Sequence, residues 1–305
     1  MQGFKNEFVK QILTLQKEIC DALETVDGAK HFVTENWERA EGGGGITRVM
    51  EGGNVFEKAG VNTSQVFGTL PQSMMEYLGI KEKSFFATGI SLVLHPKNPF
   101  APTVHANYRY FEVYNDAQEI TQFWFGGGSD LTPYYLFEED AVFFHQSLKN
   151  GCDKFDATFY PTFKKQCDDY FYNHHRQEAR GIGGIFFDRI NTMSENDPSL
   201  CFDFTSHMVT TFLKSYLPIL NKRKDLPYNI EHKNWQELRR GRYVEFNLLH
   251  DKGTLFGLKT NGRIESILMS LPPTVQWHYN AVPTKNSSEE TLLKALKNRR
   301  EWINH

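Results

Sequence analysis

Three polar side chains at alternate positions of one expected strand carry the clearest chemical signal in the sequence. His105, Asn107 and Arg109 lie two residues apart in TVHANYRYFEVY, so a strand would present all three on one face of a sheet. An arginine on such a face needs an anionic partner, because an unpaired buried guanidinium is costly. Histidine can move a proton near neutral pH. The pattern predicts either anion binding with proton transfer or a structural pair between arginine and a carboxylate.

Four histidines form a second candidate group. His95 and His105 flank the loop between two expected strands, and His145 and His175 lie on two successive expected helices. Neutral imidazole suits zinc, copper, iron or nickel, so the four together could close a metal site. Their spacing matches no compact signature such as HExxH. A structural role for each histidine therefore stays open beside the metal interpretation.

Residues near two expected turns complete the candidates. Arg180 precedes GIGGIFFD, whose Asp188 ends an expected buried strand. Both side chains could simply be solvated at the ends of their elements, where an arginine also suits a helix dipole. Asn261, Gly262 and Arg263 form an expected hairpin tip, because asparagine and glycine tolerate positive φ. This tip could also bind a ligand, in addition to forming the turn.

The stretch TQFWFGGGSDLTPYY, residues 121–135, looks at first like a phosphate-binding loop. Such a loop needs a lysine and a hydroxyl residue after its glycines, whereas here Ser-Asp follows. The acidic residue would repel a phosphate, which excludes that interpretation. Thr132 as N-cap and Pro133 at the first helical position predict a turn from a strand into a helix.

The elements that would position these residues are helices around a strand-rich centre. Apolar residues at helical spacing predict a first helix closed by Asp27-Gly28, and Ser287 caps an expected last helix. The segment GGGGITRVMEGGNVFEKAGV predicts a hairpin that turns at residues 51–54. SFFATGISLVLHP, TVHANYRYFEVY and EITQFWF predict three more strands. Further helices are expected around residues 137–148, from 163 to near 181, and from 201 to 217, before Pro218.

A late antiparallel meander is the clearest expectation of topology. RYVEFNLL, TLFGLKT and RIESILMS are separated by Asp-Lys-Gly and by Asn-Gly, which is a strong hairpin signal. The sequence contains no internal repeat or linker. These features predict an α+β protein, with residues 1–305 forming a single domain in which a large antiparallel β-sheet is flanked by α-helices on both faces.

Composition restricts the class of protein. The 305 residues are 40% hydrophobic with a net charge of −3, which argues against a nucleic-acid-binding surface. No segment approaches the ~18 to 20 uninterrupted apolar residues of a membrane span. The N-terminal residues resemble neither a signal peptide nor a transit peptide, so a cytoplasmic location is expected. The four cysteines are scattered without a CxxC pair, which predicts reduced, buried thiols.

Long glycine-punctuated blocks resemble one known family. WFGGGSDLTPYY, HHRQEARGIGGIFFD, RRGRYVEFNLLHDKGTLFGLKTNGRIESILMSLPP and GGGGITRVMEGGNVFEKAGVN closely resemble the signature blocks of oxygen-dependent coproporphyrinogen III oxidase. The resemblance implies oxidative decarboxylation of two propionates of coproporphyrinogen III by O2, giving the vinyl groups of protoporphyrinogen IX. It implies no organic cofactor, and it allows a divalent metal such as manganese without requiring one. It also implies a homodimer with its contact along Tyr243 to His278.

The resemblance carries over to individual residues. It implies substrate contacts from Ser91, Asn107, Tyr108, Arg109, Asn261, Gly262 and Arg263. Tyr108 points to the other face of the expected strand, so its contact would come from its backbone. His105 matches the family's proposed proton donor, and Arg180 and Asp188 fall in a block implicated in binding or in recognition of pyrrole N–H. Metal ligands of bacterial members match His95, His105, His145 and His175.

The sequence departs from the family pattern at several positions. Arg189 stands where a second acidic residue usually follows IFFD, so it is open which carboxylate takes part in proton transfer. Asn261 replaces a common glycine and keeps its tolerance of positive φ, and Ser129 replaces a frequent alanine. Two other functions compete with the family's reaction. One is a metal-dependent oxygenase or hydrolase built on the four histidines, and the other is a porphyrin carrier without turnover.

Overall fold

The computed structural model describes residues 3–191, 199–259 and 262–303. Its main sheet has seven antiparallel strands in the order β1-β2-β3-β4-β5-β6-β9, and β7-β8 forms a separate hairpin. The strands are β1 (Val33–Glu38), β2 (Gly43–Glu51), β3 (Phe56–Thr69), β4 (Ser84–Pro96), β5 (Thr103–Tyr114), β6 (Ile120–Thr132), β7 (Tyr172–Asn173), β8 (Glu178–Ala179) and β9 (Gly183–Ile190). The helices are α1 (Lys5–Asp27), α2 (Gln72–Leu78), α3 (Glu138–Cys152), α4 (Phe159–Tyr170), α5 (Ser199–Arg223), α6 (Ile230–Leu249), α7 (Lys252–Lys259), α8 (Ile264–Leu268) and α9 (Ser288–Lys297).

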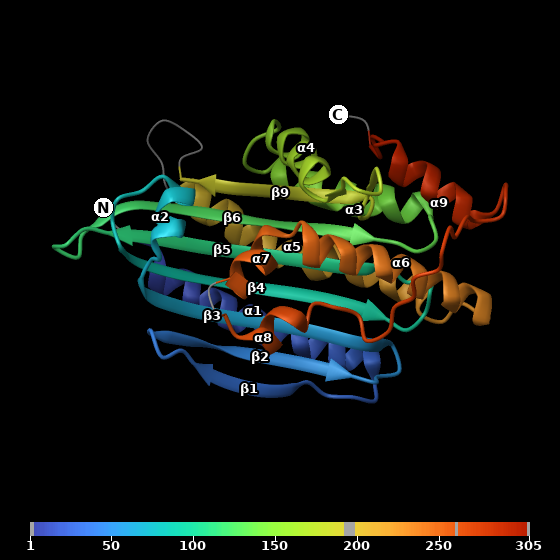
Figure 1. Cartoon of the computed structure of the whole chain (residues 1–305), viewed down its shortest axis with the longest axis horizontal. Coiled ribbons are helices and arrows are strands. Elements are labelled where there is room, and N and C mark those ends of the chain that lie inside the picture. Colours follow the sequence, from blue (N-terminus) through green and yellow to red (C-terminus); the bar gives the residue numbers. More distant parts are fainter. Residues whose placement is uncertain (1–2, 192–198, 260–261, 304–305) are drawn as a thin grey trace.

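The apolar core lies between one face of the sheet and the helices α1 and α5, which run behind the strands in Figure 1. Ile12 and Ile19 of α1 are buried in one cluster with Leu92 of β4, Tyr110 of β5 and Phe212 of α5. The helix buries one stripe at 3.6-residue spacing and each strand buries alternate residues, so the two patterns meet as a single apolar layer.

The opposite face of the sheet is covered by α6, α7 and α8, which lie in front of the strands in Figure 1. Asn62 of β3 donates a hydrogen bond from Nδ2 to the Ser266 carbonyl of α8 at 3.0 Å. The Met269 sulfur lies 2.5 Å from where a Cβ at Gly60 would be, so this close packing requires glycine. The predicted α+β class, with helices on both faces of the sheet, is confirmed.

Several predicted elements match the structure. β4 and β5 have the bounds of the two segments predicted from alternation, and β2 and β3 pair around the predicted turn at residues 51–54. Glu290 donates its backbone N–H to the Ser287 side chain at 3.2 Å, which confirms the cap of α9. The four cysteines are free and buried, as expected. No helix within the described ranges is both long and apolar enough to cross a membrane.

The expected turn at the three glycines is wrong. β6 continues through them to Thr132, and α3 begins only at Glu138, with Phe137 as its N-cap. A Cβ at residue 126 would lie 2.9 Å from the Arg109 guanidinium, and one at residue 127 would lie 2.5 Å from the Tyr108 ring. The glycines therefore make room for side chains of β5 on both faces of the sheet.

The expected late meander is also wrong, because its three segments form α6, α7 and α8. Arg240, Tyr243, Val244 and Asn247 are buried at helical spacing along α6. Two of these four residues are polar, so the apolar periodicity that marks a helix is weak here. The Asn-Gly pair separates α7 from α8, and Asn261 itself lies outside the described residues.

Two helix boundaries differ from expectation. α4 ends at Tyr170, and His175 lies in the turn between β7 and β8 rather than on a helix. α5 continues through Pro218 to Arg223, where the expected end lay at residue 217. Arg223 is buried and its Nε donates to Asp140 of α3 at 2.7 Å, so packing beyond the proline holds the helix together despite the lost backbone hydrogen bond.

Candidate active site

One row of residues crosses all seven strands on the face that α6, α7 and α8 cover. Register pairs join it from β1 to β9 as Glu35, Thr47, Asn62, Ser91, Asn107, Gly128 and Phe186. Directly paired residues of an antiparallel sheet point to the same side. Ser91 and Asn107, two of the predicted substrate contacts, are therefore neighbours on this face.

The two flanking rows place the remaining polar residues of the strands beside Ser91 and Asn107. One row pairs Gly89 with Arg109 and Arg109 with Gly126, and the other pairs Val93 with His105 and His105 with Asp130. The predicted shared face of His105, Asn107 and Arg109 is confirmed. Gly89 and Gly128 leave part of this face as backbone without side chains, which a flat ligand can approach, and the Arg109 side chain lies over Gly126. We call the three rows between β4 and β6 the sheet floor.

His105 is held by a buried carboxylate. Its Nδ1 lies 2.8 Å from Asp130 Oδ1, and Arg180 NH2 donates to both oxygens of Asp130 at 2.8 and 2.7 Å. The carboxylate accepts, so His105 Nδ1 carries the proton. His105 Nε2 has no hydrogen-bond partner among the described residues, and its side chain is 22% exposed. This leaves one ring nitrogen free to exchange a proton with a ligand.

Burial and charge oppose each other at Asp130. Burial alone would raise the pKa of this carboxyl, but the Arg180 charge and the His105 hydrogen bond outweigh it and hold the pKa below its usual value. The Arg180 guanidinium is buried against the rings of Phe171 and Tyr243, 4.1 and 4.7 Å from their centroids. Its NH1 donates to Asn247 Oδ1 at 2.9 Å. Asp130 is therefore a fixed anion that orients the imidazole.

Arg109 and Asp188 form the second charged group of the sheet floor. Arg109 NH2 lies 2.7 Å from Asp188 Oδ1, and NH1 donates to Asn107 Oδ1 at 3.1 Å. The register of β6 and β9 shifts between Phe125 and Gly127, so β9 bulges opposite Gly126. Arg189 adopts φ 53° in this bulge. A bulge re-aims a side chain, and here Asp188 meets Arg109 across the glycine. The pair is partly exposed, and a ligand carboxylate can compete for it.

Arg263 lies on the other side of the sheet floor. It precedes α8, donates from NH1 to Ser266 Oγ at 2.9 Å and pairs with Glu35 of β1. Glu35 is four strands from Arg109, or roughly 19 Å at about 4.8 Å per strand. Arg109 therefore belongs to the floor, whereas Arg263 lies beyond it, beside α8 at the β1 end of the same face. The predicted hairpin tip is absent, and Gly262 instead donates its N–H to the Gly257 carbonyl at 2.8 Å, between α7 and α8.

Tyr108 faces the apolar core, as predicted. Its hydroxyl hydrogen bonds with Ser129 Oγ at 2.8 Å, and the side chain is 1% exposed. Only its backbone belongs to the face that carries Asn107 and Arg109.

The four histidines do not converge. The ring nitrogens of His95 contact Thr103 Oγ1 at 3.1 Å and the Ser270 carbonyl at 2.9 Å. Burial, together with the nearby Arg240 charge, lowers the pKa of His95 well below its usual value. His175 lies near the surface, where its ring contacts His250 at 2.9 Å and Glu245 at 2.8 Å.

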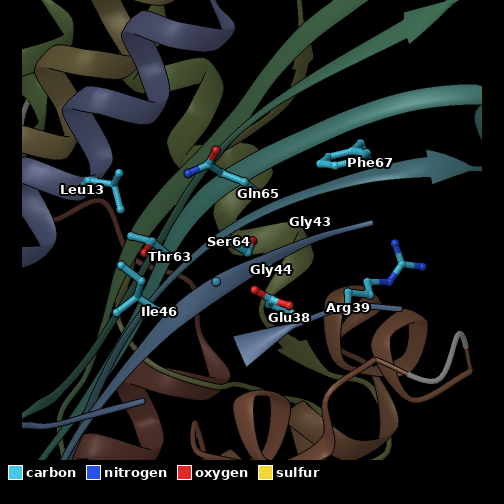
Figure 2. A pocket seen from close by; sticks show the side chains of 11 residues that line it. Leu13, Glu38, Arg39, Gly43, Gly44, Ile46, Thr63, Ser64, Gln65 and Phe67 are labelled. Carbon is cyan, nitrogen blue, oxygen red and sulfur yellow. The ribbon is translucent and has the colours of Figure 1, made fainter. Parts of the chain in front are cut away.

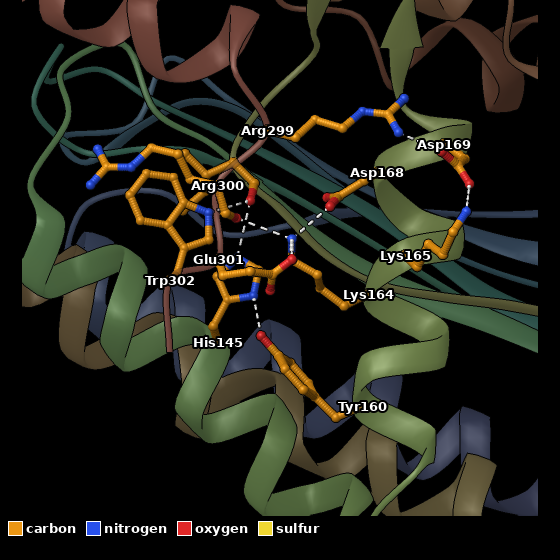
Figure 3. Close-up of polar contacts among 11 residues, drawn as sticks. His145, Tyr160, Lys164, Lys165, Asp168, Asp169, Arg299, Arg300, Glu301 and Trp302 are labelled. Carbon is orange, nitrogen blue, oxygen red and sulfur yellow. Dashed lines mark hydrogen bonds and ion pairs between the residues drawn. The ribbon is translucent and has the colours of Figure 1, made fainter. Parts of the chain in front are cut away.

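His145 lies on α3, next to Tyr160 of α4 and Trp302 of the C-terminal segment (Figure 3). Its Nδ1 contacts the Tyr160 hydroxyl at 2.9 Å, and its Nε2 donates to the Ile182 carbonyl at 3.0 Å. Trp302 stacks on the ring and donates to the same carbonyl at 3.1 Å. Burial lowers the pKa of His145 to about 4. His145 therefore contacts both the C-terminal segment, through Trp302, and the chain just before β9, through Ile182.

The residues present therefore do not fit a metal ion shared by these histidines. In His95, His145 and His175 both ring nitrogens already bind protein groups. No group of three or more His, Cys, Asp or Glu side chains suited to a metal occurs within the described ranges. Within the described part of the chain, the four predicted ligands are not brought together as one metal cluster.

The candidate residues sort into three groups. His105, Ser91, Asn107, Arg109 and Asp188 lie on or beside the sheet floor. Arg180 lies between Asp130 and α6 on the same face, and Arg263 lies beyond the floor, beside Glu35 of β1. Asp130 was missed as a site residue, and Tyr243 and Asn247, which contact Arg180, were predicted only within the dimer contact. Asp130 could have been found by extending the strand of residues 120–125 through the glycines, because alternation then pairs it with His105.

A cavity of about 530 Å³ lies at the far edge of the sheet, around β1, β2 and β3 (Figure 2). Its lining includes Glu38, Arg39, Thr63 and Gln65. It contains none of the predicted site residues. The sheet floor is preferred as the functional site because the proton-exchanging and anion-binding groups gather there, and size alone does not identify a site.

Comparison with known proteins shows the family to which the chain belongs. Residues 7–302 match the family described as coproporphyrinogen III oxidase. The chain is 53% identical over 97% of its length, and 79% of the relative, to the "Oxygen-dependent coproporphyrinogen-III oxidase, chloroplastic" of Glycine max. It is 51% identical to the Drosophila melanogaster oxygen-dependent enzyme, over 96% of this chain and 76% of the relative. The corresponding Mus musculus protein, named as mitochondrial, is 49% identical over 99% of this chain and 70% of the relative. The chain belongs to the coproporphyrinogen III oxidase family.

Proposed function

We propose that the chain catalyses the oxygen-dependent decarboxylation of two propionates of coproporphyrinogen III, giving the vinyl groups of protoporphyrinogen IX in haem biosynthesis. The observation that carries the proposal is the sheet floor. A glycine-lined surface carries Arg109 and a histidine held by a buried carboxylate, and Arg263 lies farther along the same face beside α8. A tetracarboxylate macrocycle needs flat room, cations at its edge and a group that handles protons.

Each of the two decarboxylations balances as one two-electron oxidation. The propionate loses CO2 from its carboxylate carbon and a hydrogen with two electrons from the carbon attached to the pyrrole, so a vinyl group forms. O2 accepts the two electrons and, with two protons, becomes hydrogen peroxide. The electron-rich pyrrole supports the developing positive charge. The proposed reaction therefore needs O2 as co-substrate and no organic cofactor, and none of its steps uses a metal.

Arg109 and Arg263 are proposed to hold propionates. In the free chain both guanidinium groups pair with partly exposed carboxylates, Asp188 and Glu35. A propionate carboxylate can replace these partners and can accept two hydrogen bonds from one guanidinium group. Ser91 and Asn107 are paired neighbours beside Arg109 on the same face and are proposed to supply neutral hydrogen bonds. The family resemblance adds Gly262, Asn261 and the Tyr108 backbone to the substrate contacts.

His105 is proposed to exchange the proton with the substrate through Nε2. Asp130 fixes the tautomer and stabilises the imidazolium that forms on protonation. Arg180 is proposed to act through Asp130, because it is buried behind the carboxylate. Asp188 is proposed to accept a hydrogen bond from a pyrrole N–H once a propionate has taken Arg109. The neighbouring residue in the bulge is Arg189, where the family usually has a second acidic residue. Asp188 is therefore proposed to accept this hydrogen bond alone.

Assembly as a homodimer is proposed through the surface of Tyr243 to His278. Tyr243 itself is buried, but Leu249, Ile264 and Trp277 are more than half exposed. Large exposed apolar side chains on one stretch of chain support an interface there. The cytoplasmic location remains a prediction, since the Glycine max and Mus musculus relatives are named as organellar.

The test is product analysis of coproporphyrinogen III incubated in air with chelator-treated protein, beside an anaerobic sample. Oxygen-dependent appearance of the divinyl product is expected. Recovery of product only after one particular divalent metal is added would show that the reaction needs that metal. Return of the bound substrate unchanged under every condition would overturn the proposal in favour of a porphyrin carrier.

A further inference from the structure

Asn62 of β3 marks the boundary between the covered and the open parts of the site. It pairs in register with Thr47 on one side and with Ser91 on the other, so it points to the same face as the sheet floor. On the Thr47 side, α8 closes the face, since Thr47 Oγ1 contacts Ser266 Oγ at 2.9 Å. On the Ser91 side the floor begins.

The orientation of the Asn62 amide is fixed by α8. Its Nδ2 donates to the Ser266 carbonyl at 3.0 Å. If the amide were flipped, Oδ1 would face the Ser266 carbonyl oxygen, and neither atom could donate a hydrogen bond. Nδ2 therefore faces that carbonyl, and Oδ1 lies on the side away from it. The amide therefore donates a hydrogen bond to the protein through Nδ2, and its Oδ1 stays available to accept one.

That acceptor has no partner in the described part of the chain, although the atom is buried. Buried polar atoms are normally satisfied, and leaving one unpaired costs free energy. An unpaired acceptor at the edge of a binding surface is explained if a ligand supplies the donor. The ligand group must be an N–H or O–H, because a carboxylate has nothing to donate at neutral pH.

We propose that Asn62 Oδ1 accepts a hydrogen bond from a pyrrole N–H of the bound tetrapyrrole and so selects the reduced ring. This inference rests on the proposed function. A porphyrinogen carries four pyrrole N–H groups on a flexible ring, and any of them can turn outward to an acceptor. In the oxidised porphyrin two N–H groups remain, and both point into the centre of a planar ring. The propionates are identical in the two molecules, so contacts to Arg109 and Arg263 do not discriminate between them.

The experiment compares anaerobic binding of coproporphyrinogen III and of coproporphyrin III to the wild type and to Asn62→Ala. Asn62→Leu, which fills a similar space without an acceptor, is the second variant if the alanine protein does not fold. Thr47→Val is the matched control, because it removes a contact between the sheet and α8 but keeps the Asn62 amide. Divinyl product from the wild type in air is recorded alongside.

Loss of Asn62 is expected to weaken porphyrinogen binding on the order of 3- to 10-fold, as for one neutral hydrogen bond, and to change porphyrin binding less than about 2-fold. Thr47→Val is expected to affect both ligands alike. Equal weakening of both ligands by Asn62→Ala or Asn62→Leu, or no weakening, overturns the inference while wild-type turnover leaves the proposed function standing. A wild type that forms no divinyl product overturns both.

Discussion

His105 and Asp130 are register partners on β5 and β6, and Nδ1 of the histidine lies 2.8 Å from Oδ1 of the carboxylate. The pairing depends on the three glycines before Asp130 remaining in the strand, because a turn there would remove the carboxylate from the sheet. The glycines thus give the site both its floor and its buried anion.

Replacing Asp130 by asparagine is expected to lower kcat about 100-fold or more, because His105 loses the group that fixes its tautomer. Arg180 would also lose its buried partner, so the free energy of unfolding should fall by several kcal/mol. Steady-state kinetics and urea unfolding measure the two effects. Ser129→Ala is the control, since that side chain points to the opposite face. A kcat within a few-fold of wild type would contradict the role of Asp130.

His145 should make folding stability depend on pH. Its pKa is about 4 in the folded protein and near 6.5 in the unfolded chain, so the unfolded state binds more protons between these values. The contribution is fully present above pH 6.5 and is lost as the pH falls toward 4, by about 3 kcal/mol at most.

The test of His145 is the free energy of unfolding as a function of pH for the wild type and His145→Gln. The variant should show a flatter dependence between pH 4 and 6.5. His31, whose side chain is 85% exposed, provides the control His31→Gln, which should keep the wild-type slope. An unchanged slope in His145→Gln would mean that other groups cause the dependence.

Replacing Arg263 by alanine should raise KM for coproporphyrinogen III on the order of 10-fold and leave kcat nearly unchanged, because the guanidinium binds a remote propionate. Arg263→Lys keeps the charge but cannot donate two parallel hydrogen bonds, so its KM should lie between those of the wild type and Arg263→Ala. Steady-state kinetics separates the constants. A fall in kcat at constant KM would instead place Arg263 at the reacting carbons.

The dimer should depend on the apolar side chains of the Tyr243 to His278 surface. Leu249→Asp places a charge where an apolar contact is expected, so sedimentation at micromolar concentration should show the monomer. Val142→Asp on α3 is the control, since Val142 is also exposed but lies on another element. A monomeric wild type would contradict the proposed assembly directly.

Strands with regular alternation could be predicted from the sequence. β5 alternates buried and partly open residues with few exceptions, and β4 alternates over residues 86–92, so the shared face of His105, Asn107 and Arg109 follows from period two. The class α+β also follows, because strands and helices occur in separate blocks.

The rest could not be predicted because tertiary contacts override local preference. Glycines usually end a strand, but at residues 126–128 neighbouring side chains of β5 fill the space that a Cβ would need. The face of α6 that packs on the sheet carries Gln236, Arg240 and Asn247, so no apolar stripe marks the helix. The four histidines shared only a residue type, and the fold separates them.

The most direct measurement of the central claim is kcat and KM for His105→Ala and Arg109→Ala, determined side by side with coproporphyrinogen III in air. The proposed roles predict opposite results. His105→Ala should lower kcat about 100-fold with little change in KM, whereas Arg109→Ala should raise KM about 10-fold or more with a smaller change in kcat. Equal and small effects of both substitutions would contradict the assignment of the reaction to this face of the sheet.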